Sequence, residues 1–268
     1  MPEVRANGVT LYYEEHGAGE PIVCIHGTGS SALLWADAAI ELAKHGRSIV
    51  YDRRGFSRSE RPEPFVTDVH EQTDDAAALI DALTAAPAIV IGRSHGGEIA
   101  VDLALRYPDR VRALALLEGG GLILGDAFRR WLAAVDEEVL AAAEADVSTV
   151  GEVLLRAILG DAVWDGLPEA VQQVFTDNGP AIVAEDRGGL LDVTAEELGA
   201  IDLPTLIVAA RDSPPGFAEV TTLVAAAIPS SRVEWVEGGH LIDPAHPAVL
   251  AFVDDVLAEG SPRRLQPG

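Results

Sequence analysis

The sequence is poor in cysteine and has no long apolar run, and each shortage excludes a class of protein. The single cysteine, Cys24, cannot form a disulfide within the chain. No apolar run approaches the ~20 residues that a membrane-spanning helix needs, and the N-terminus lacks the charged and then apolar pattern of a secretory signal peptide. We therefore expect a cytoplasmic protein that does not associate with a membrane.

Positive charge is scarce as well. The chain has 43 acidic and 19 basic residues and a formal net charge of −24. This excess repels nucleic-acid phosphates and anionic membranes, so we expect small neutral or apolar molecules as partners and no nucleic acid. Because 48% of the 268 residues are hydrophobic, the chain can bury a sizeable core.

Short apolar runs alternate with helical patterns over most of the chain. Strands are expected at residues 9–17, 21–27, 47–55, 87–94, 110–118, 203–212 and 232–240, and helices at 68–85, 95–108, 214–228 and 246–260. Such alternation favours βαβ units. The predicted fold class is α/β, with a doubly wound and mostly parallel sheet.

The strand–helix rhythm stops between about 122 and 200. There the chain is rich in Ala, Leu and Glu, and helices are expected at 128–145, 150–167 and 167–179. We expect residues 1–121 and 201–268 to form the α/β core, and residues 122–200 to form a helical cap over the strand ends. The apolar side chains of this cap could cover a pocket or mediate a homodimer contact.

A G-x-S-x-G motif, "GRSHG" at residues 92–96, lies between an expected strand and an expected helix. In this setting the motif is typical of a sharp turn that exposes a nucleophilic serine at the carboxyl edge of the sheet. Gly92 and Gly96 have no Cβ and let the strand and the helix approach closely. Ser94 is therefore the predicted nucleophile.

A serine nucleophile needs a base and hydrogen-bond donors for the oxyanion. His240 lies in the Gly-rich "EGGHL" after the last expected strand and is the predicted base. The "HGTGSS" loop begins at His26, which we expect to brace it. The backbone N–H groups of Thr28 and His95 are the predicted oxyanion donors. The sequence has no metal-ligand spacing and no cofactor motif, so we expect neither a metal nor a cofactor.

These motifs, in this order, resemble those of the α/β-hydrolase superfamily. The resemblance rests on "HGTG", "YDRRGFSRS", "GRSHGG", "RYPDRVRALALLE" and "GGH", and it covers nearly the whole chain, with the cap least specific. It implies a Ser–acid–His triad whose acid lies between the serine and the histidine in the sequence. Haloalkane dehalogenases and epoxide hydrolases of this fold use an aspartate where this chain has Ser94, which argues against both activities.

The usual acid position of the superfamily falls on an ambiguous stretch. That acid follows the strand after the cap in a Gly-x-x-Asp motif, which corresponds here to "IVAARDSPP". If Ala209 replaces the glycine, the acid is Asp212. If Ala210 replaces it, the position falls on Ser213, a plausible helix cap. Because neighbouring residues at a strand end face different directions, this one-residue ambiguity of the alignment weakens the case for Asp212. Asp212 remains the alternative acid.

Glu118 in "LALLEGGG" is the leading candidate for the acid. Its expected strand follows the nucleophile's βα unit, so the two strands should be neighbours, and its side chain leaves at the same edge. A subset of the superfamily, including lactone hydrolases of the zearalenone type, carries the acid here as Glu. The competing interpretation is a hinge residue paired with Arg129 or Arg130 of the cap.

The motifs together predict a serine hydrolase that cleaves a carboxylic ester or lactone through an acyl-enzyme. Hydrolysis of a C–C bond, hydrolysis of a thioester, and acyl transfer use the same triad and are the alternatives within the superfamily. A small-molecule receptor without turnover is the alternative outside the enzyme class. We expect the cap to supply an apolar pocket, with the candidate lining residues Leu122, Ile123, Leu124, Phe128, Trp131 and Trp164.

Overall fold

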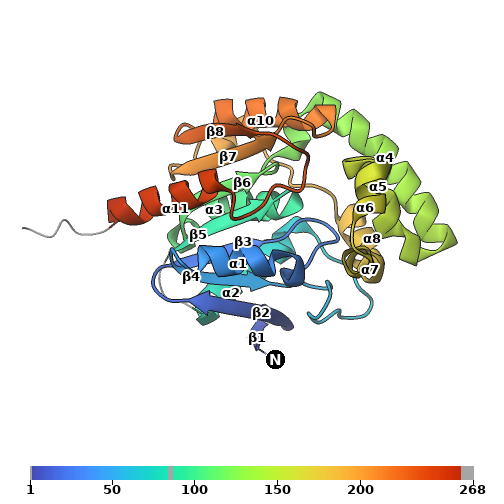
Figure 1. Ribbon diagram of the computed structural model, residues 1–268, viewed down its shortest axis with the longest axis horizontal. Helices are drawn as coiled ribbons and strands as arrows, with labels where there is room; N and C mark the ends of the chain where they lie inside the picture. The colour runs from blue at the N-terminus through green and yellow to red at the C-terminus, as the bar shows by residue number, and fades with distance from the viewer. Residues whose placement is uncertain (1, 84–86, 261–268) are drawn as a thin grey trace, which may run out of the picture.

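The computed structural model describes residues 2–83 and 87–260 and shows the predicted α/β architecture. Within them, one sheet contains the strands β1 (Glu3–Ala6), β2 (Val9–Gly17), β3 (Pro21–Ile25), β4 (Arg47–Tyr51), β5 (Ala88–Arg93), β6 (Val111–Leu117), β7 (Thr205–Ala210) and β8 (Ser231–Val236). Their order is β1-β2-β4-β3-β5-β6-β7-β8 (Figure 1). Only the pairs β1–β2 and β2–β4 are antiparallel, so the sheet is mostly parallel as predicted.

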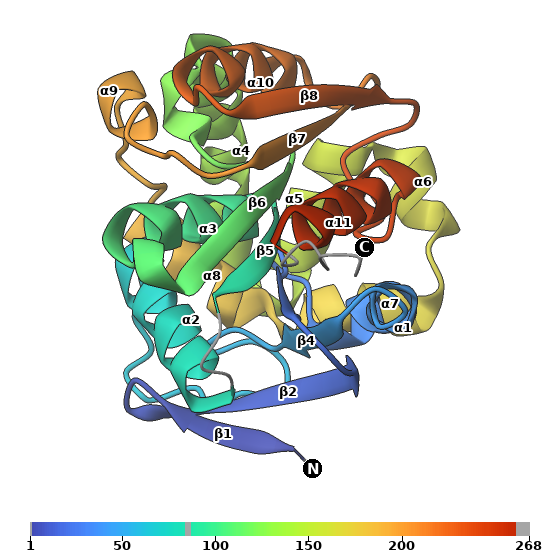
Figure 2. The same cartoon turned by 90° about the vertical axis from the view of Figure 1, so that its left-hand side faces the viewer.

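Helices cover both faces of the sheet (Figure 2). One face packs on α2 (Val69–Leu83), α3 (His95–Arg106) and α10 (Pro215–Ala227), and the other on α1 (Ala36–Leu42) and α11 (Pro247–Gly260). Alternate residues of β3 join the two apolar clusters: Val23 and Ile25 the first, Ile22 and Cys24 the second. Because both faces are buried, the central strands are continuous apolar runs in the sequence.

The helices between β6 and β7 are α4 (Asp126–Ala145), α5 (Val150–Leu159), α6 (Asp161–Gly166), α7 (Glu169–Asp177), α8 (Gly179–Gly188) and α9 (Ala195–Leu198). Figure 1 shows α4 to α8 grouped at one end of the sheet. They have an apolar cluster of their own, which includes Val135, Leu155 and Phe175. Leu198 of α9 belongs instead to the apolar cluster of the sheet. The division of the chain into core and cap stays a prediction.

The helices differ in places from the sequence prediction. The helix expected at 150–167 is interrupted at Gly160, whose φ of +82° favours glycine. The whole of α8 was not predicted, because its segment has no clear amphipathic repeat. The end of the helix expected at 68–85 lies outside the described residues. None of the helices in the described ranges combines the length and apolar character that crossing a membrane requires.

Candidate active site

Ser94 lies in a strained turn between β5 and α3. Its φ of +55° and ψ of −124° are unfavourable for a residue with a Cβ. The turn is possible because two glycines flank it. A Cβ at Gly92 would lie 2.3 Å from the Gly96 carbonyl oxygen, and one at Gly96 would lie 2.3 Å from the Ile25 carbonyl oxygen. The two glycines thus allow a strained serine at a position that lines a cavity.

His240 reaches the same place from the loop after β8. Its side chain is buried, and its ring lies 4.6 Å from the ring of Phe217, centre to centre. Nδ1 of His240 lies 2.8 Å from Oε2 of Glu118. A hydrogen bond at Nδ1 leaves Nε2 free to exchange a proton with a neighbouring hydroxyl, which is the arrangement a triad histidine needs.

Glu118 is held firmly at the carboxyl end of β6. It is 2% exposed, and its φ of +51° marks a second strained backbone position. Its Oε1 accepts a hydrogen bond from the Ala210 N–H at 2.7 Å, and its Oε2 accepts one from the Ser213 hydroxyl as well as contacting His240. Both carboxylate oxygens are therefore fixed, and β5 and β6 are neighbours as predicted.

The structure places Asp212 and Ser213 differently from the sequence prediction. The Asp212 side chain is exposed and makes no hydrogen bond or ion pair within the described residues, while its N–H donates to the Gly238 carbonyl. The helix cap expected at Ser213 is wrong, because α10 begins at Pro215 after Pro214. The Ser213 hydroxyl instead donates to Glu118. The hinge interpretation of Glu118 is wrong as well, because within the described residues its carboxylate pairs with neither Arg129 nor Arg130.

The loop after β3 lies against the nucleophile. A Cβ at Gly27 would be 3.2 Å from the Ser94 Cβ. Among the described residues, neither the Thr28 N–H nor the His95 N–H has a hydrogen-bond acceptor, and both residues line the cavity beside Ser94. Free N–H groups next to a nucleophile are what an oxyanion hole requires.

Side chains from the core and from the helices above it hold this loop. The His26 ring nitrogens contact the Gly27 carbonyl at 2.8 Å and the Arg53 N–H at 3.0 Å. Burial, and then the charge of Arg53, lower the pKa of His26 well below its usual range, so His26 braces the loop in its neutral form. The buried amide of Asn178 donates to the Gly29 and Ser30 carbonyls, which fixes the loop from α8's side.

Glu185 of α8 is a buried charge that no sequence motif indicated. It pairs with Arg53, accepts a hydrogen bond from the Thr28 side chain, and lies 3.2 Å from Nε2 of His95. Burial opposes its charge, but Arg53 and then His95 more than compensate and lower its pKa to about 2. Glu185 therefore remains charged and connects α8 to both residues that supply the candidate oxyanion donors.

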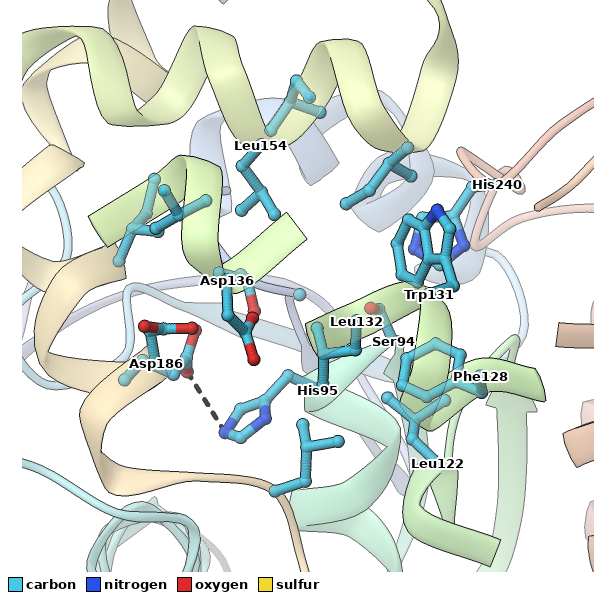
Figure 3. A pocket seen from close by; sticks show the side chains of 18 of the residues that line it. Ser94, His95, Leu122, Phe128, Trp131, Leu132, Asp136, Leu154, Asp186 and His240 are labelled. Atoms are coloured by element: carbon cyan, nitrogen blue, oxygen red, sulfur yellow. Dashed lines mark ion pairs between the residues drawn. The ribbon is translucent and has the colours of Figure 1, made fainter. Parts of the chain in front are cut away.

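A cavity of about 390 Å³ opens above Ser94 and His240. Figure 3 shows Phe128, Trp131 and Leu122 close to these two residues. Of the lining residues expected from the sequence, Leu122, Ile123, Phe128 and Trp131 do line the cavity. Leu124 packs against the apolar cluster of the sheet, and Trp164 packs on Phe175 inside the helical cluster. The described residues contain no group of three His, Cys, Asp or Glu side chains placed to hold a metal ion.

Comparison with known proteins identifies the family. A family model described as the alpha/beta hydrolase fold matches residues 20–243. The chain is an α/β hydrolase. The hydrolase is 30% identical over 255 residues to a relative named "Putative carbamate hydrolase RutD" from Azorhizobium caulinodans, a match that covers 93% of this chain and 95% of the relative.

Two further similar proteins are named for other activities. A 2-hydroxymuconate semialdehyde hydrolase of Pseudomonas sp. is 39% identical over 123 residues, which cover 45% of the hydrolase and 44% of that protein. Among solved structures, Est816, described as an N-acyl homoserine lactone degrading enzyme, has a TM-score of 0.73 and 25% identity. That match covers 97% of the hydrolase and 100% of Est816. The relatives thus share hydrolysis and differ in the bond that their names imply.

We expect Gly119→Ala to destabilise the hydrolase and slow its turnover. A Cβ at Gly119 would lie 2.3 Å from the Ser94 carbonyl oxygen, so the nucleophile's turn must shift. Overpacking of this kind costs about 1–3 kcal/mol. The melting temperature and kcat should both fall. The control is Gly166→Ala, where a Cβ meets nothing within 4 Å and where neither quantity should fall. Equal melting temperatures and equal kcat for the two variants would contradict this packing.

We expect Glu185→Gln to destabilise the hydrolase by about 3 kcal/mol at pH 7, because it leaves Arg53 buried without its charge partner. The pKa of Glu185 falls from 4.5 to about 2 on folding, so its stabilisation is complete above about pH 4.5 and is lost as the pH falls toward 2. Urea unfolding at pH 7 and pH 3 should show the gap between wild type and variant narrowing at pH 3.

The control for this comparison is Glu152→Gln. Glu152 pairs with Arg156 on the surface of α5, and its side chain is 44% exposed. Removing that charge should cost less than about 1 kcal/mol at either pH. A Glu185→Gln effect of the same size as the control, or one that does not change between pH 7 and pH 3, would show that the buried pair does not stabilise the fold.

Proposed function

We propose that this α/β hydrolase is a serine hydrolase that cleaves a carboxylic ester or a lactone. The observation that carries the proposal is the Glu118–His240 contact beside a strained Ser94, with His240 and Ser94 lining the same cavity. Each of the three side chains comes from a different strand end, and a Ser–His–acid triad is recognised by geometry and roles of this kind.

In the proposed reaction, the Ser94 Oγ attacks the substrate carbonyl carbon while Nε2 of His240 takes the hydroxyl proton. The carbonyl oxygen becomes an oxyanion that accepts hydrogen bonds from the Thr28 and His95 N–H groups. His240 then gives the proton to the departing alkoxide, and the C–O bond breaks to leave an acyl-serine. Water, deprotonated by His240, attacks the acyl carbon and releases the acid.

Glu118 keeps His240 in the tautomer that carries a proton on Nδ1 and stabilises the imidazolium formed in each step. Its two other hydrogen bonds, from Ala210 and Ser213, keep the carboxylate from rotating away. The apolar cavity wall, with Phe128 and Trp131, suits the hydrocarbon part of an ester or lactone.

The test is a hydrolysis screen across the candidate bond types, with each rate divided by the uncatalysed rate of the same substrate to correct for leaving-group reactivity. It compares a p-nitrophenyl ester, a γ-lactone, a thioester, a carbamate and a 1,5-diketone, each with wild type and with Ser94→Ala. We expect the ester or the lactone to have the highest corrected kcat/KM and the Ser94→Ala rate to fall by several orders of magnitude. Preference for the carbamate or the diketone would assign the site to a different bond. Equal rates for the two proteins would favour a receptor without turnover.

A further inference from the structure

The buried carboxylate of Glu185 contacts the side chains of both residues whose N–H groups are the candidate oxyanion donors. It accepts a hydrogen bond from the Thr28 side chain, and its Oε1 lies 3.2 Å from Nε2 of His95. In Figure 3 the His95 ring extends to the side away from Ser94, where the dashed line marks its ion pair. Thr28 follows β3 and His95 begins α3, so one carboxylate joins two separate strand–helix units.

Residues around the sheet fix this carboxylate from its other side. Arg53 pairs with Glu185, and the Gln72 amide donates to its Oε1 at 3.2 Å. Arg53 follows β4 and Gln72 belongs to α2, so both are held by the layers of the core. All three side chains are buried, and hydrogen bonds between buried polar groups are stronger than those exposed to water. Glu185 therefore has a fixed place relative to the sheet, although it belongs to α8.

The His95 ring is enclosed from its other side as well. Its Nδ1 lies 3.1 Å from Oε2 of Glu98, which belongs to the same helix and is fully buried. Oε1 of Glu98 accepts a hydrogen bond from the Leu122 N–H at 3.3 Å. A carboxylate thus lies against each nitrogen of the ring. Because a strained backbone persists only where its surroundings hold it, these contacts help to keep the turn between Ser94 and His95 in place.

Glu185 acts on the geometry of the oxyanion hole, because its charge alone would oppose an oxyanion. The residue lines the cavity together with Thr28 and His95, and two negative charges close together repel each other. The ion pair with Arg53 offsets this charge. A donor of an oxyanion hole must lie about 2.7–3.1 Å from the oxyanion, and a displacement of about 1 Å can cost about 10²-fold in rate.

We infer that Glu185 is a positioning residue of the oxyanion hole: its contacts with the Thr28 and His95 side chains set the directions of both donor N–H groups. The inference rests on the proposed serine-hydrolase reaction and adds to it a residue that acts through the two donors. It also gives α8, which carries none of the catalytic motifs, a part in the support of the hole.

The first test is the kinetics of Glu185→Gln with the best ester of the screen, after circular dichroism has shown that the variant is folded. We expect kcat to fall by about tenfold to a hundredfold. KM should stay within about threefold, since the donors bind the oxyanion more strongly than the ester carbonyl.

The matched control for this loss is Asp75→Asn. Asp75 forms a buried ion pair with Arg54 and is not among the described residues that line the cavity. This variant should be destabilised as well but should keep wild-type kcat. Equal kcat for Glu185→Gln and Asp75→Asn would mean that a buried ion pair matters only for folding, and it would overturn the inference.

A second pair of variants tests the same contact without removing a buried charge. Thr28→Val removes the hydroxyl that donates to Glu185 and keeps the backbone N–H, whereas Thr28→Ser keeps both groups. We expect Thr28→Val to lower kcat by about tenfold and Thr28→Ser to lose less. Because one contact joins the two residues, the loss in Thr28→Val/Glu185→Gln should be smaller than the product of the single losses. Losses that multiply would contradict the inference.

Inhibitor binding separates the oxyanion hole from the rest of the cavity. The Ser94 Oγ adds to the carbonyl carbon of an alkyl trifluoromethyl ketone, its proton passes to Nε2 of His240, and the carbonyl oxygen becomes an oxyanion in the hole. The secondary alcohol made by reducing the ketone has no carbonyl to attack. For Glu185→Gln we expect the affinity for the ketone to fall by about tenfold or more and the affinity for the alcohol to equal that of wild type.

Two results of this experiment separate the inference from the reaction on which it rests. If wild type prefers the ketone and Glu185→Gln keeps the whole preference, the inference is wrong and the proposed reaction stands. If wild type binds the ketone no more tightly than the alcohol, Ser94 does not form the adduct, and both the proposed reaction and the inference are wrong.

Discussion

We expect Glu118→Gln to lower kcat by about 10³–10⁴-fold, and Asp212→Asn to leave it within about twofold of wild type. The glutamine keeps the size of the side chain but has no negative charge, so the His240 imidazolium loses its partner. If the amide NH₂ faces Nδ1, it also favours the wrong tautomer. Asp212 has an exposed side chain with no contact to His240, so its loss should not affect the reaction.

The measurement is kcat and KM for the best ester of the screen, with both variants checked for folding by circular dichroism. The loss for Glu118→Gln should appear in kcat with little change in KM, because the carboxylate does not touch the substrate. Ser213→Ala should lower kcat by a smaller factor, since it removes one of the hydrogen bonds to Glu118. A large loss with Asp212→Asn and near-normal turnover with Glu118→Gln would show that the acid is assigned to the wrong residue.

We expect Ser94→Ala to lower kcat by about 10⁴–10⁶-fold, the largest loss of any single substitution at the site. In the proposed reaction the Ser94 hydroxyl forms the covalent bond, and alanine has no group that could replace it. The candidate oxyanion donors of Thr28 and His95 remain in the variant, so weak turnover above the uncatalysed rate can persist.

This loss should be specific to the nucleophile. Ser230→Ala removes an exposed hydroxyl that donates to the Leu203 carbonyl just before β8 begins, at the end of the strand opposite the loop that carries His240, and should keep wild-type kcat. The affinity of Ser94→Ala for an ester analogue that neither protein cleaves, measured by equilibrium binding, should be similar to that of wild type. Rates within tenfold of wild type would mean that bond cleavage does not proceed through Ser94.

The sequence predicted the parts of the site that lie in short, local patterns. The strand–turn–helix around Ser94 needs glycines at fixed spacing, and these are readable from "GRSHG". The placement of Glu118 beside β5 followed from the rule that consecutive parallel strands tend to be neighbours, and the sheet order agrees. The boundaries of β2 and β5 also agree within one residue, because the half-buried β2 alternates apolar and polar residues and the buried β5 is a continuous apolar run.

Parts of the site that depend on contacts between distant segments could not be predicted. Glu185 and Asn178 are more than 80 residues from the loops that they hold, and no spacing rule connects them. Ser213 was expected to cap a helix, since a serine before two prolines usually does. Because α10 begins at Pro215, the Ser213 hydroxyl does not cap it and donates to Glu118 instead. The packing around the candidate triad determines this hydrogen bond, and a local sequence pattern does not.

The central claim is that Ser94 is an activated nucleophile, and a labelled fluorophosphonate tests it most directly. The probe's phosphorus bonds to an activated serine oxygen as fluoride leaves, and intact-protein mass spectrometry counts the adducts. We expect one adduct per wild-type chain, located on Ser94 by peptide mapping, none on Ser94→Ala, and slower labelling of Glu118→Gln than of Asp212→Asn. A wild-type protein that stays unmodified, or a Ser94→Ala variant labelled as fast as wild type, would contradict the account.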